Sequence, residues 1–270
     1  MADPGLKGVP KTMLIPLWAR AEESERRDAI IKDPLAQELV SKIGLDVSVY
    51  KKEWMTQLVV AIRTEILDRE TRIFIDKHPG AMVINLGCGL DTRFFRVDDG
   101  SLRWYDLDLP DAINVRREFF AETGRYRMLA RSVFDYSWVS DISRSRESGE
   151  PVLIIAEGLL MYFPESQVKE LLSVLSTAFP GVEMLLETMS PFMVQESKKP
   201  ETGRRFQIDV SFEWGVQSGK ELEKFNDRIR LVNEWNPLDY HKQRWKTMRW
   251  LTMIPTIRNS FGSRIIHITL

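Results

Sequence analysis

Two glycines separated by one residue, Gly87 and Gly89, follow directly on a short apolar run from Met82 to Leu86. The run contains β-branched residues and predicts a strand, and Asp91 and Thr92 beyond the glycines can cap a helix. Glycines at such a turn let the backbone approach a ligand closely, and the N–H groups at the start of the helix can bind it. The same turn also occurs for steric reasons alone, so its context decides its meaning.

Acidic side chains after the next apolar segment supply that context. Leu102 to Tyr105 predicts a strand, and Asp106 and Asp108 follow it. In a doubly wound sheet, an acid at the tip of the second strand lies beside the first turn and can accept hydrogen bonds from a ribose diol. Together the two features predict an adenosine-type ligand. The sequence leaves open which of the two aspartates holds the ribose.

The spacing of the glycines separates two kinds of adenosine ligand. A dinucleotide fingerprint has a third glycine three positions after the second, where a pyrophosphate rests, and this chain has Thr92 there. S-adenosylmethionine carries a ribose but no phosphate. We therefore expect S-adenosylmethionine and a methyltransferase, with a nicotinamide-dependent oxidoreductase as an alternative.

Composition narrows the class of protein further. The 270 residues are 43% hydrophobic and 29% charged, with a formal net charge of −1, which is typical of an ordinary soluble globular protein. The chain has no excess of basic residues that would predict nucleic-acid binding. Its single cysteine, Cys88, excludes an internal disulfide framework and a cysteine-rich metal site. The first residues lack the apolar core of a signal peptide, and no apolar run is long enough to span a bilayer. We expect a cytoplasmic protein with a small-molecule partner and no nucleic-acid or membrane partner.

The order of the predicted elements indicates the fold class. Residues 12–77 predict helices interrupted near Pro34, Gly44 and Tyr50, so residues 1–80 form a helical cap. Residues 81–188 form the cofactor-binding core. Its remaining elements are strands at 126–130, 152–156 and 182–187 and helices at 111–122 and 165–178. This alternation predicts an α/β protein with a parallel sheet and right-handed crossovers.

The alternation breaks after the fifth strand. Ligands of open α/β sheets bind at the carboxyl ends of the strands, so we expect residues 189–219 to be a lid over the substrate. Residues 220–270 complete the sheet. They are predicted to form a helix at 220–226, a strand at 229–234, one helix from His241 to about Arg258, and a final strand at 264–270, which brings the sheet to seven strands, the last antiparallel. All four parts belong to one domain.

Five ordered motifs resemble the leucine carboxyl methyltransferase family, and more closely its bacterial branch of polyketide O-methyltransferases. The motifs are Lys11-Thr12 with Trp18-Ala19-Arg20-Ala21, Ile62-Arg63-Thr64, Leu86 to Arg93, Tyr105 to Pro110, and Ala156-Glu157-Gly158 through Met161-Tyr162. The resemblance implies a class I, Rossmann-like S-adenosylmethionine methyltransferase with an N-terminal helical extension and an insertion after the fifth strand. It also implies S-adenosylmethionine as the cofactor and S-adenosylhomocysteine as its product.

The family pattern also implies roles for individual residues. Lys11 and Arg63 would hold the methionine carboxylate of the cofactor, and Glu157 would approach the methionyl end. Gly87 and Gly89 would line the seat, and Asp108 would bind the ribose, with Asp106 the other candidate from the residues themselves. Many relatives have an acid and a leucine after the third strand, where this chain has Ser132 and Val133, which are the candidates for contacting adenine.

The nature of the methyl acceptor can be argued from acidity. A carboxyl group with a pKa of about 4 is ionised at pH 7, whereas a phenol with a pKa of about 10 needs a base. Of the three histidines, only His241 is expected at the active edge of the sheet, and Tyr162 is a second catalytic candidate. This shortage of bases favours a carboxylate acceptor and leaves a phenolic hydroxyl open.

Large apolar residues in the insertion and the C-terminal third favour a flat, polyketide-like aromatic acid as acceptor. Trp214 is the candidate in the insertion for lining such a pocket, and Arg20 or Arg204 is the candidate for binding the acceptor's carboxylate. Two alternatives are a protein carboxyl methyltransferase and a protein that binds S-adenosylmethionine without catalysis. A groove open to a peptide terminus would favour the first, and a site too narrow for any acceptor would favour the second.

Overall fold

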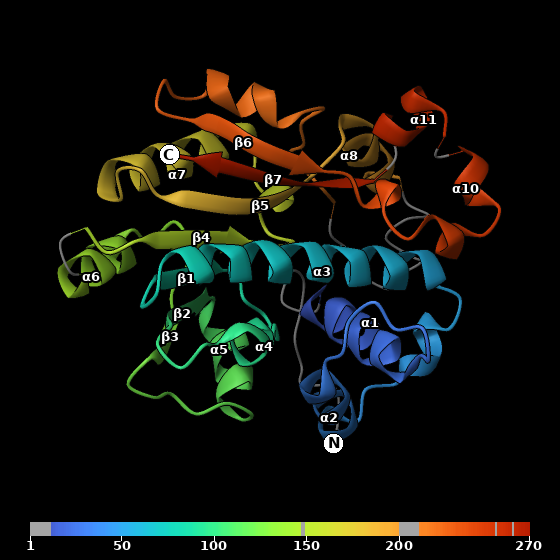
Figure 1. The fold of residues 1–270 in the computed structure, drawn as a ribbon, viewed down its shortest axis with the longest axis horizontal. Helices are drawn as coiled ribbons and strands as arrows, with labels where there is room; N and C mark the ends of the chain where they lie inside the picture. Colours follow the sequence, from blue (N-terminus) through green and yellow to red (C-terminus); the bar gives the residue numbers. More distant parts are fainter. Residues whose placement is uncertain (1–11, 147–148, 200–210, 252, 261) are drawn as a thin grey trace.

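Seven strands form one sheet in a computed structural model that describes residues 12–146, 149–199, 211–251, 253–260 and 262–270 (Figure 1). The strand order is β3-β2-β1-β4-β5-β7-β6. The parallel strands are β1 (Met82–Leu86), β2 (Arg103–Asp108), β3 (Tyr126–Ala130), β4 (Val152–Ala156) and β5 (Glu183–Met189). β7 (Ser263–Thr269) runs antiparallel to both β5 and β6 (Arg230–Trp235). The expected α/β class, with seven strands and an antiparallel last strand, is confirmed.

The helical cap has the predicted interruptions. It consists of α1 (Leu14–Glu25), α2 (Pro34–Ile43), the 3₁₀ helix η2 (Val47–Tyr50) and α3 (Trp54–Lys77). Asp33 caps α2 by accepting a hydrogen bond from the Ala36 N–H, and Gly44 ends it with a φ of 68°. Figure 1 shows α3 lying lengthwise beside the sheet, and α1 packs on α3 and on α2. No helix in the described part of the chain is both long and apolar enough to cross a bilayer.

Four further helices follow the strands and complete the two layers around the sheet. They are α4 (Arg93–Val97), α5 (Pro110–Arg117), α6 (Ser137–Ser145) and α7 (Glu165–Ala178). β1 is buried along its whole length, but its side chains alternate between two cores. Met82, Ile84 and Leu86 pack with α6 and α7, whereas Val83 packs with α3, α4 and α5. Both faces of the sheet are therefore covered, as a parallel sheet requires.

The insertion after β5 returns to the loop that follows β4. It begins with α8 (Pro191–Ser197), and Gly215 then forms a bridge with Met189. The Glu213 N–H donates a 2.8 Å hydrogen bond to the Met161 carbonyl in η3 (Leu160–Tyr162). Residues 200–210 lie outside the described residues, so the lid function of residues 189–219 stays a prediction.

The prediction of a single helix from His241 to about Arg258 is wrong. The chain instead forms η6 (Lys242–Trp245), α10 (Met248–Leu251) and α11 (Pro255–Ser260), preceded by η5 (Pro237–Asp239). His241 and Lys246 have φ values of 47° and 51°, which a continuous helix does not allow. Tertiary packing explains the break, because Trp245 is buried and its indole N–H donates to the Tyr240 carbonyl. The helix expected at 220–226 is likewise a 3₁₀ helix, η4 (Gly219–Lys224).

The strand register aligns four residues at the carboxyl ends of β1, β2, β4 and β5. Leu86 pairs with Leu107 on one side and with Ala156 on the other, and Ala156 pairs with Leu186. The next residue of each strand therefore lies in one row at the carboxyl edge of the sheet. From β2 across to β5, the row reads Asp108, Gly87, Glu157 and Glu187.

A substitution of Trp138, whose indole is buried, tests the packing of the core on the α6 and α7 face. Its ring is fully buried, and its N–H donates a 3.0 Å hydrogen bond to the Val133 carbonyl. Trp138→Ala should lower the free energy of unfolding by about 3 to 5 kcal/mol in urea denaturation, because it leaves a cavity and an unpaired carbonyl. Val232→Ala is the matched control, since Val232 is 53% exposed and its loss should cost less than about 0.5 kcal/mol. Equal losses in both variants would contradict this description of the core.

Candidate functional site

The turn after β1 has the predicted glycine conformation. Gly87 and Gly89 have φ values of 64° and 46°, which side-chain-bearing residues rarely adopt. Added Cβ atoms would lie 2.7 Å from the Leu159 side chain and 2.8 Å from the Met13 side chain. Part of the need for glycine therefore comes from protein packing. Met13, just before α1, and Leu159, after β4, both lie against the turn, so the helical cap and the β4 loop meet over it.

The two candidate aspartates on β2 have separate roles. Asp106 is fully buried within the strand, where its carboxylate pairs with Arg116 at 2.6 Å and accepts hydrogen bonds from Tyr126, Trp104 and Asn85. The burial of Asp106 among these partners leaves no room for a ribose. The strand is longer than the sequence predicted, and this places Asp106 inside it.

Asp108 lies at the end of β2 and faces the glycine turn. Its Oδ2 accepts a 2.8 Å hydrogen bond from the Gly89 N–H, and its Oδ1 accepts one of 2.7 Å from the Leu109 N–H. Burial raises the pKa of Asp108, although these backbone donors oppose the shift. The side chain is partly exposed, so each oxygen keeps a lone pair for a further donor.

Arg63 on α3 lies between two carboxylates of the row. Its Nη2 is 2.7 Å from Glu157 Oε1, and its Nη1 is 2.6 Å from Glu187 Oε2. Glu187 also accepts a 3.0 Å hydrogen bond from the Gly158 N–H, so one carboxylate ties α3 to the loop after β4. Arg63 Nε is buried and has no hydrogen-bond partner among the described residues. The guanidinium thus keeps one buried donor unused.

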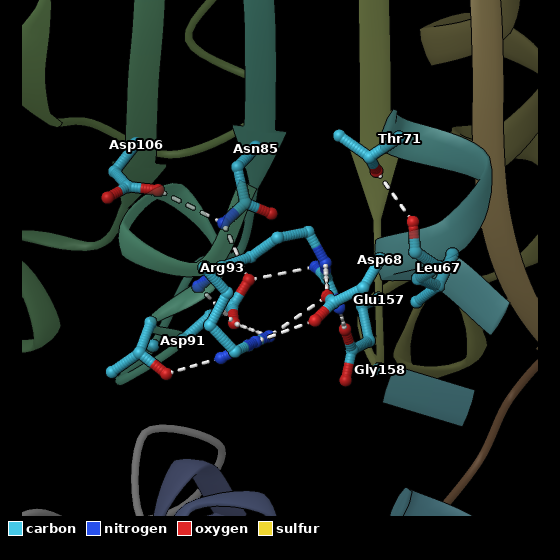
Figure 2. Close-up of polar contacts among 12 residues, drawn as sticks. Leu67, Asp68, Thr71, Asn85, Asp91, Arg93, Asp106, Glu157 and Gly158 are labelled. Atoms are coloured by element: carbon cyan, nitrogen blue, oxygen red, sulfur yellow. Dashed lines mark hydrogen bonds and ion pairs between the residues drawn. The ribbon is translucent and has the colours of Figure 1, made fainter. Parts of the chain in front are cut away.

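The ion pairs of Arg63 extend into a buried network beneath the turn. Arg93 contacts Asp68 at 2.8 Å, Asp91 at 2.8 Å and Glu157 at 2.5 Å (Figure 2). Arg96 adds contacts to Asp68, Asp91 and Asp33, and Asp33 in turn pairs with Arg20. The connected groups are four arginines and five carboxylates, so the network has a formal charge of −1. The members are Arg20, Arg63, Arg93, Arg96, Asp33, Asp68, Asp91, Glu157 and Glu187.

The network sets the ionisation of its members in opposite directions. Burial opposes charge at Glu157, but the charges of Arg63 and Arg93 lower its pKa below the ordinary value. At Glu187, burial prevails over Arg63, and the neighbouring Glu157 also helps to raise the pKa. Glu157 is therefore the carboxylate that stays charged most firmly at the sheet edge.

The adenine candidates lie at the end of β3. Ser132 Oγ accepts a 3.3 Å hydrogen bond from the Phe134 N–H, and the Val133 carbonyl accepts the indole N–H of Trp138. Val133 is buried in the core on the α6 and α7 face. The pairing of Ala130 with Asp108 places this segment beside the end of β2. A role in adenine binding stays a prediction.

Of the two catalytic candidates, Tyr162 follows β4, and His241 follows β6. Burial raises the pKa of Tyr162, so its phenol stays protonated at neutral pH and can donate a hydrogen bond but not act as a base. His241 Nε2 is 2.8 Å from Glu65 Oε2 on α3, so the imidazole has an acidic partner there. Tyr162 is therefore not a general base at neutral pH, whereas His241 forms a histidine–carboxylate pair with Glu65 through one ring nitrogen.

The substrate-binding roles expected of Arg20 and Trp214 do not fit their positions. Arg20 is 2% exposed and binds Asp33 and the Leu90 carbonyl, so it joins α1 to the turn instead of facing an acceptor. Trp214 is 3% exposed and packs in the core on the α6 and α7 face. Lys11 and Arg204, expected to bind the cofactor and the acceptor, lie outside the described residues.

Three carboxylates of the network have no counterpart in the sequence-based predictions. Glu187 stands at the end of the fifth strand expected from the sequence, and this position was the signal for it, although β5 extends to Met189. Asp68 lies five residues after Arg63 on α3, and Asp33 caps α2, so neither position differs in sequence from an ordinary helical residue. No group of three or more potential metal ligands is found in the described part of the chain.

Comparisons with known sequences identify the family of this chain. A family model described as leucine carboxyl methyltransferase matches residues 13–176. The tetracenomycin polyketide synthesis O-methyltransferase TcmP of Streptomyces glaucescens is 31% identical over 235 residues, which cover 87% of this chain and 85% of that protein. The chain belongs to the leucine carboxyl methyltransferase family. It is an S-adenosylmethionine-dependent methyltransferase.

Other comparisons extend the family and the fold. The S-adenosyl-L-methionine-dependent methyltransferase dpfgK of Gibberella zeae is 32% identical over 262 residues, which cover 85% of each chain. A crystal structure of a duf574 family protein from Streptomyces avermitilis has a TM-score of 0.62 at 12% identity and covers 96% of both chains. At that identity the second likeness concerns the fold alone. Membership of the leucine carboxyl methyltransferase family is thus consistent with the sheet and with the sequence motifs on it.

Lowering the pH should weaken the network, and a substitution of Asp91 tests this. Burial would raise the pKa of Asp91, but Arg93 and Arg96 lower it well below 3.8. Its charged form therefore stabilises the fold above about pH 4, and this stabilisation is lost as the pH falls toward the lowered folded-state pKa. Asp91→Asn should lower the free energy of unfolding by about 3 kcal/mol at neutral pH in guanidinium denaturation, and should lose less than the wild type between about pH 5 and pH 3.

The exposed Asp141, which pairs with Arg131 and Arg144 at the surface, provides the control. Asp141→Asn should change stability by less than about 1 kcal/mol and keep the pH dependence of the wild type. An Asp91→Asn variant whose stability still falls as steeply with acid as that of the wild type would show that Asp91 does not have this role.

Proposed function

We propose that this protein transfers a methyl group to the carboxylate of an apolar, aromatic small molecule and releases a methyl ester. The observation that carries the proposal is the row of Asp108, Gly87, Glu157 and Glu187, with Arg63 and Arg93 behind it. The Streptomyces glaucescens relative is a polyketide synthesis O-methyltransferase, which supports a small-molecule acceptor. The carboxylate and the aromatic character of the acceptor are our own inference.

The residues of the row fit S-adenosylmethionine. Asp108 keeps acceptor capacity on both oxygens, which suits a ribose diol. The unused buried Nε of Arg63 is a donor for the methionine carboxylate, and Glu157 is a firmly charged partner for the ammonium group. The formal charge of −1 on the network also favours a ligand with a net positive charge, as S-adenosylmethionine has.

The bound cofactor supplies a methyl group on a positively charged sulfur. In the transfer, the acceptor's carboxylate oxygen would take this methyl group, and S-adenosylhomocysteine would leave as a neutral thioether. No proton leaves a carboxylate in this step, so the site needs no base. The protonated Tyr162 agrees with this requirement. The chain's own contribution is to align the two reactants and to exclude water.

Removing the charge of Asp108 should weaken cofactor binding. In Asp108→Asn, one acceptor oxygen becomes an amide donor, so calorimetric titration should show affinity for S-adenosylmethionine and for S-adenosylhomocysteine reduced by about tenfold to a hundredfold. The affinity of the wild type should fall in acid as Asp108, with its raised pKa, becomes protonated. Asp111→Asn is the matched control, because Asp111 is exposed in the first turn of α5. Unchanged binding in Asp108→Asn would exclude the ribose role, and no binding by the wild type would exclude the cofactor site.

The chemical nature of the product distinguishes a carboxylate from a phenol. With labelled S-adenosylmethionine and a panel of aromatic acids and phenols, we expect the label in a product that releases methanol in mild alkali, as esters do and ethers do not. The rate should vary little between about pH 6 and pH 8, because a carboxylate is already ionised there. An alkali-stable product whose rate rises with pH would show a phenolic acceptor. Tyr162→Phe should lower activity without changing this pH profile.

A further inference from the structure

The C-terminal part of the chain has a charge that the whole-chain balance hides. Residues 240–270 contain six lysines and arginines and no aspartate or glutamate, although the complete chain has a formal net charge of −1. The six are Lys242, Arg244, Lys246, Arg249, Arg258 and Arg264. An absence of acids over so long a segment makes its solvent-facing part a cationic surface.

Large apolar side chains are exposed within the same segment. Trp250 is 61% exposed, Met253 66% and Ile254 47%. Eight large hydrophobic residues are exposed in the described part of the chain, and three of them fall within these five positions. Single exposed apolar residues are ordinary, but a local group of three that includes a tryptophan marks an interaction surface.

Cationic side chains surround these apolar ones. The guanidinium carbon of Arg249 is 4.6 Å from the centre of the Trp250 ring, and Lys246 Nζ is 4.4 Å from the centre of the Trp54 ring. Lys51 and Lys52, both exposed, precede Trp54 in the chain. We call the set Lys246, Arg249, Trp250, Met253 and Ile254 the α10 surface.

Two other arginines of the C-terminal segment are paired with acids. Glu23 and Asp28 contact Arg244, and Asp239 contacts Arg258 at 3.0 Å. Lys242 and Lys246 form no ion pair with the described residues. Within the α10 surface, the positive charge of Lys246 is therefore available to an anionic partner.

The α10 surface lies at the outer end of the molecule. In Figure 1, α10 and α11 lie beyond the sheet near α8, at the end toward which the arrowheads of β4 and β6 point. This is the edge of the sheet where the glycine turn and its row of carboxylates lie. A partner on the α10 surface would therefore approach the protein from the side of this edge.

We propose that the α10 surface binds the interface of an anionic lipid bilayer. Tryptophan and aliphatic side chains insert at the level of the headgroups, while neighbouring lysines and arginines attract anionic lipids. The charge sign fits such a surface, and three apolar side chains are far fewer than the 20 to 30 residues that each side of a stable protein interface contributes. The proposal concerns a peripheral contact and does not depend on the methyl transfer.

Vesicle sedimentation tests the proposal on the full chain. The protein should sediment with vesicles of mixed phosphatidylserine and phosphatidylcholine at low salt, much less at high salt, and weakly with phosphatidylcholine alone. Lys246→Glu and, separately, Trp250→Ser should each weaken binding to the anionic vesicles by about tenfold. Lys224→Glu and Val232→Ser are the matched controls, since Lys224 is exposed and Val232 is 53% exposed on β6. Both controls should bind as the wild type does.

Several results would overturn the proposal. The proposal is wrong if the protein does not sediment with anionic vesicles at low salt, if it binds neutral vesicles equally well, or if the control variants lose as much vesicle binding as the α10 variants. A dimer in analytical ultracentrifugation that Trp250→Ser dissociates, without vesicle binding by the wild type, would assign the surface to a second copy of the chain. Met253→Ser, checked for an unchanged unfolding midpoint, gives a second reading if Trp250→Ser folds poorly. Cofactor titration of the same variants separates a failure of this proposal from a failure of the methyltransferase assignment.

Discussion

Charge pairing inside the protein is the constraint on which the rest of the structure depends. Arg93 is completely buried and has three carboxylate partners, and Arg63 has two. A buried charge is tolerated only when it is paired, so each of these side chains fixes the position of the elements that supply its partners. The helical cap, the glycine turn and the loops after β4 and β5 are thereby held at one edge of the sheet. Removing one partner would leave the others as uncompensated buried charges.

The long helix α3 transmits this constraint across the molecule. It carries Arg63 and Asp68 to the network and Glu65 to His241, and its apolar residues pack on the sheet. α3 therefore couples the cap to strands that lie far from it in sequence. The same organisation explains why the family motifs are dispersed along the chain. Each motif supplies one partner of an interaction that forms only when the sheet and the cap have assembled.

The carboxylates of the site differ in pKa, and this difference suits them to different tasks. Glu157 keeps its charge because two arginines contact it, whereas burial raises the pKa of Glu187 and of Asp108. A firmly charged acid suits a cationic ligand, and an acid at the mouth of the turn suits hydroxyl donors. The environment of each carboxylate, and not its residue type, decides what it can do.

The sequence alone determined the α/β class, the strands at 126–130 and 152–156, the helix at 165–178, and the turn at Gly87 and Gly89, because these depend on local periodicity and on backbone conformation. Tertiary structure decided the rest. The length of β2 and the buried Arg116 separated Asp106 from Asp108, and the packing of Trp245 broke the helix expected after His241. The burial of Arg20 and Trp214 and the place of Glu187 in the row also emerged only from the fold. Each of these outcomes depends on contacts between residues distant in sequence, which no local pattern records.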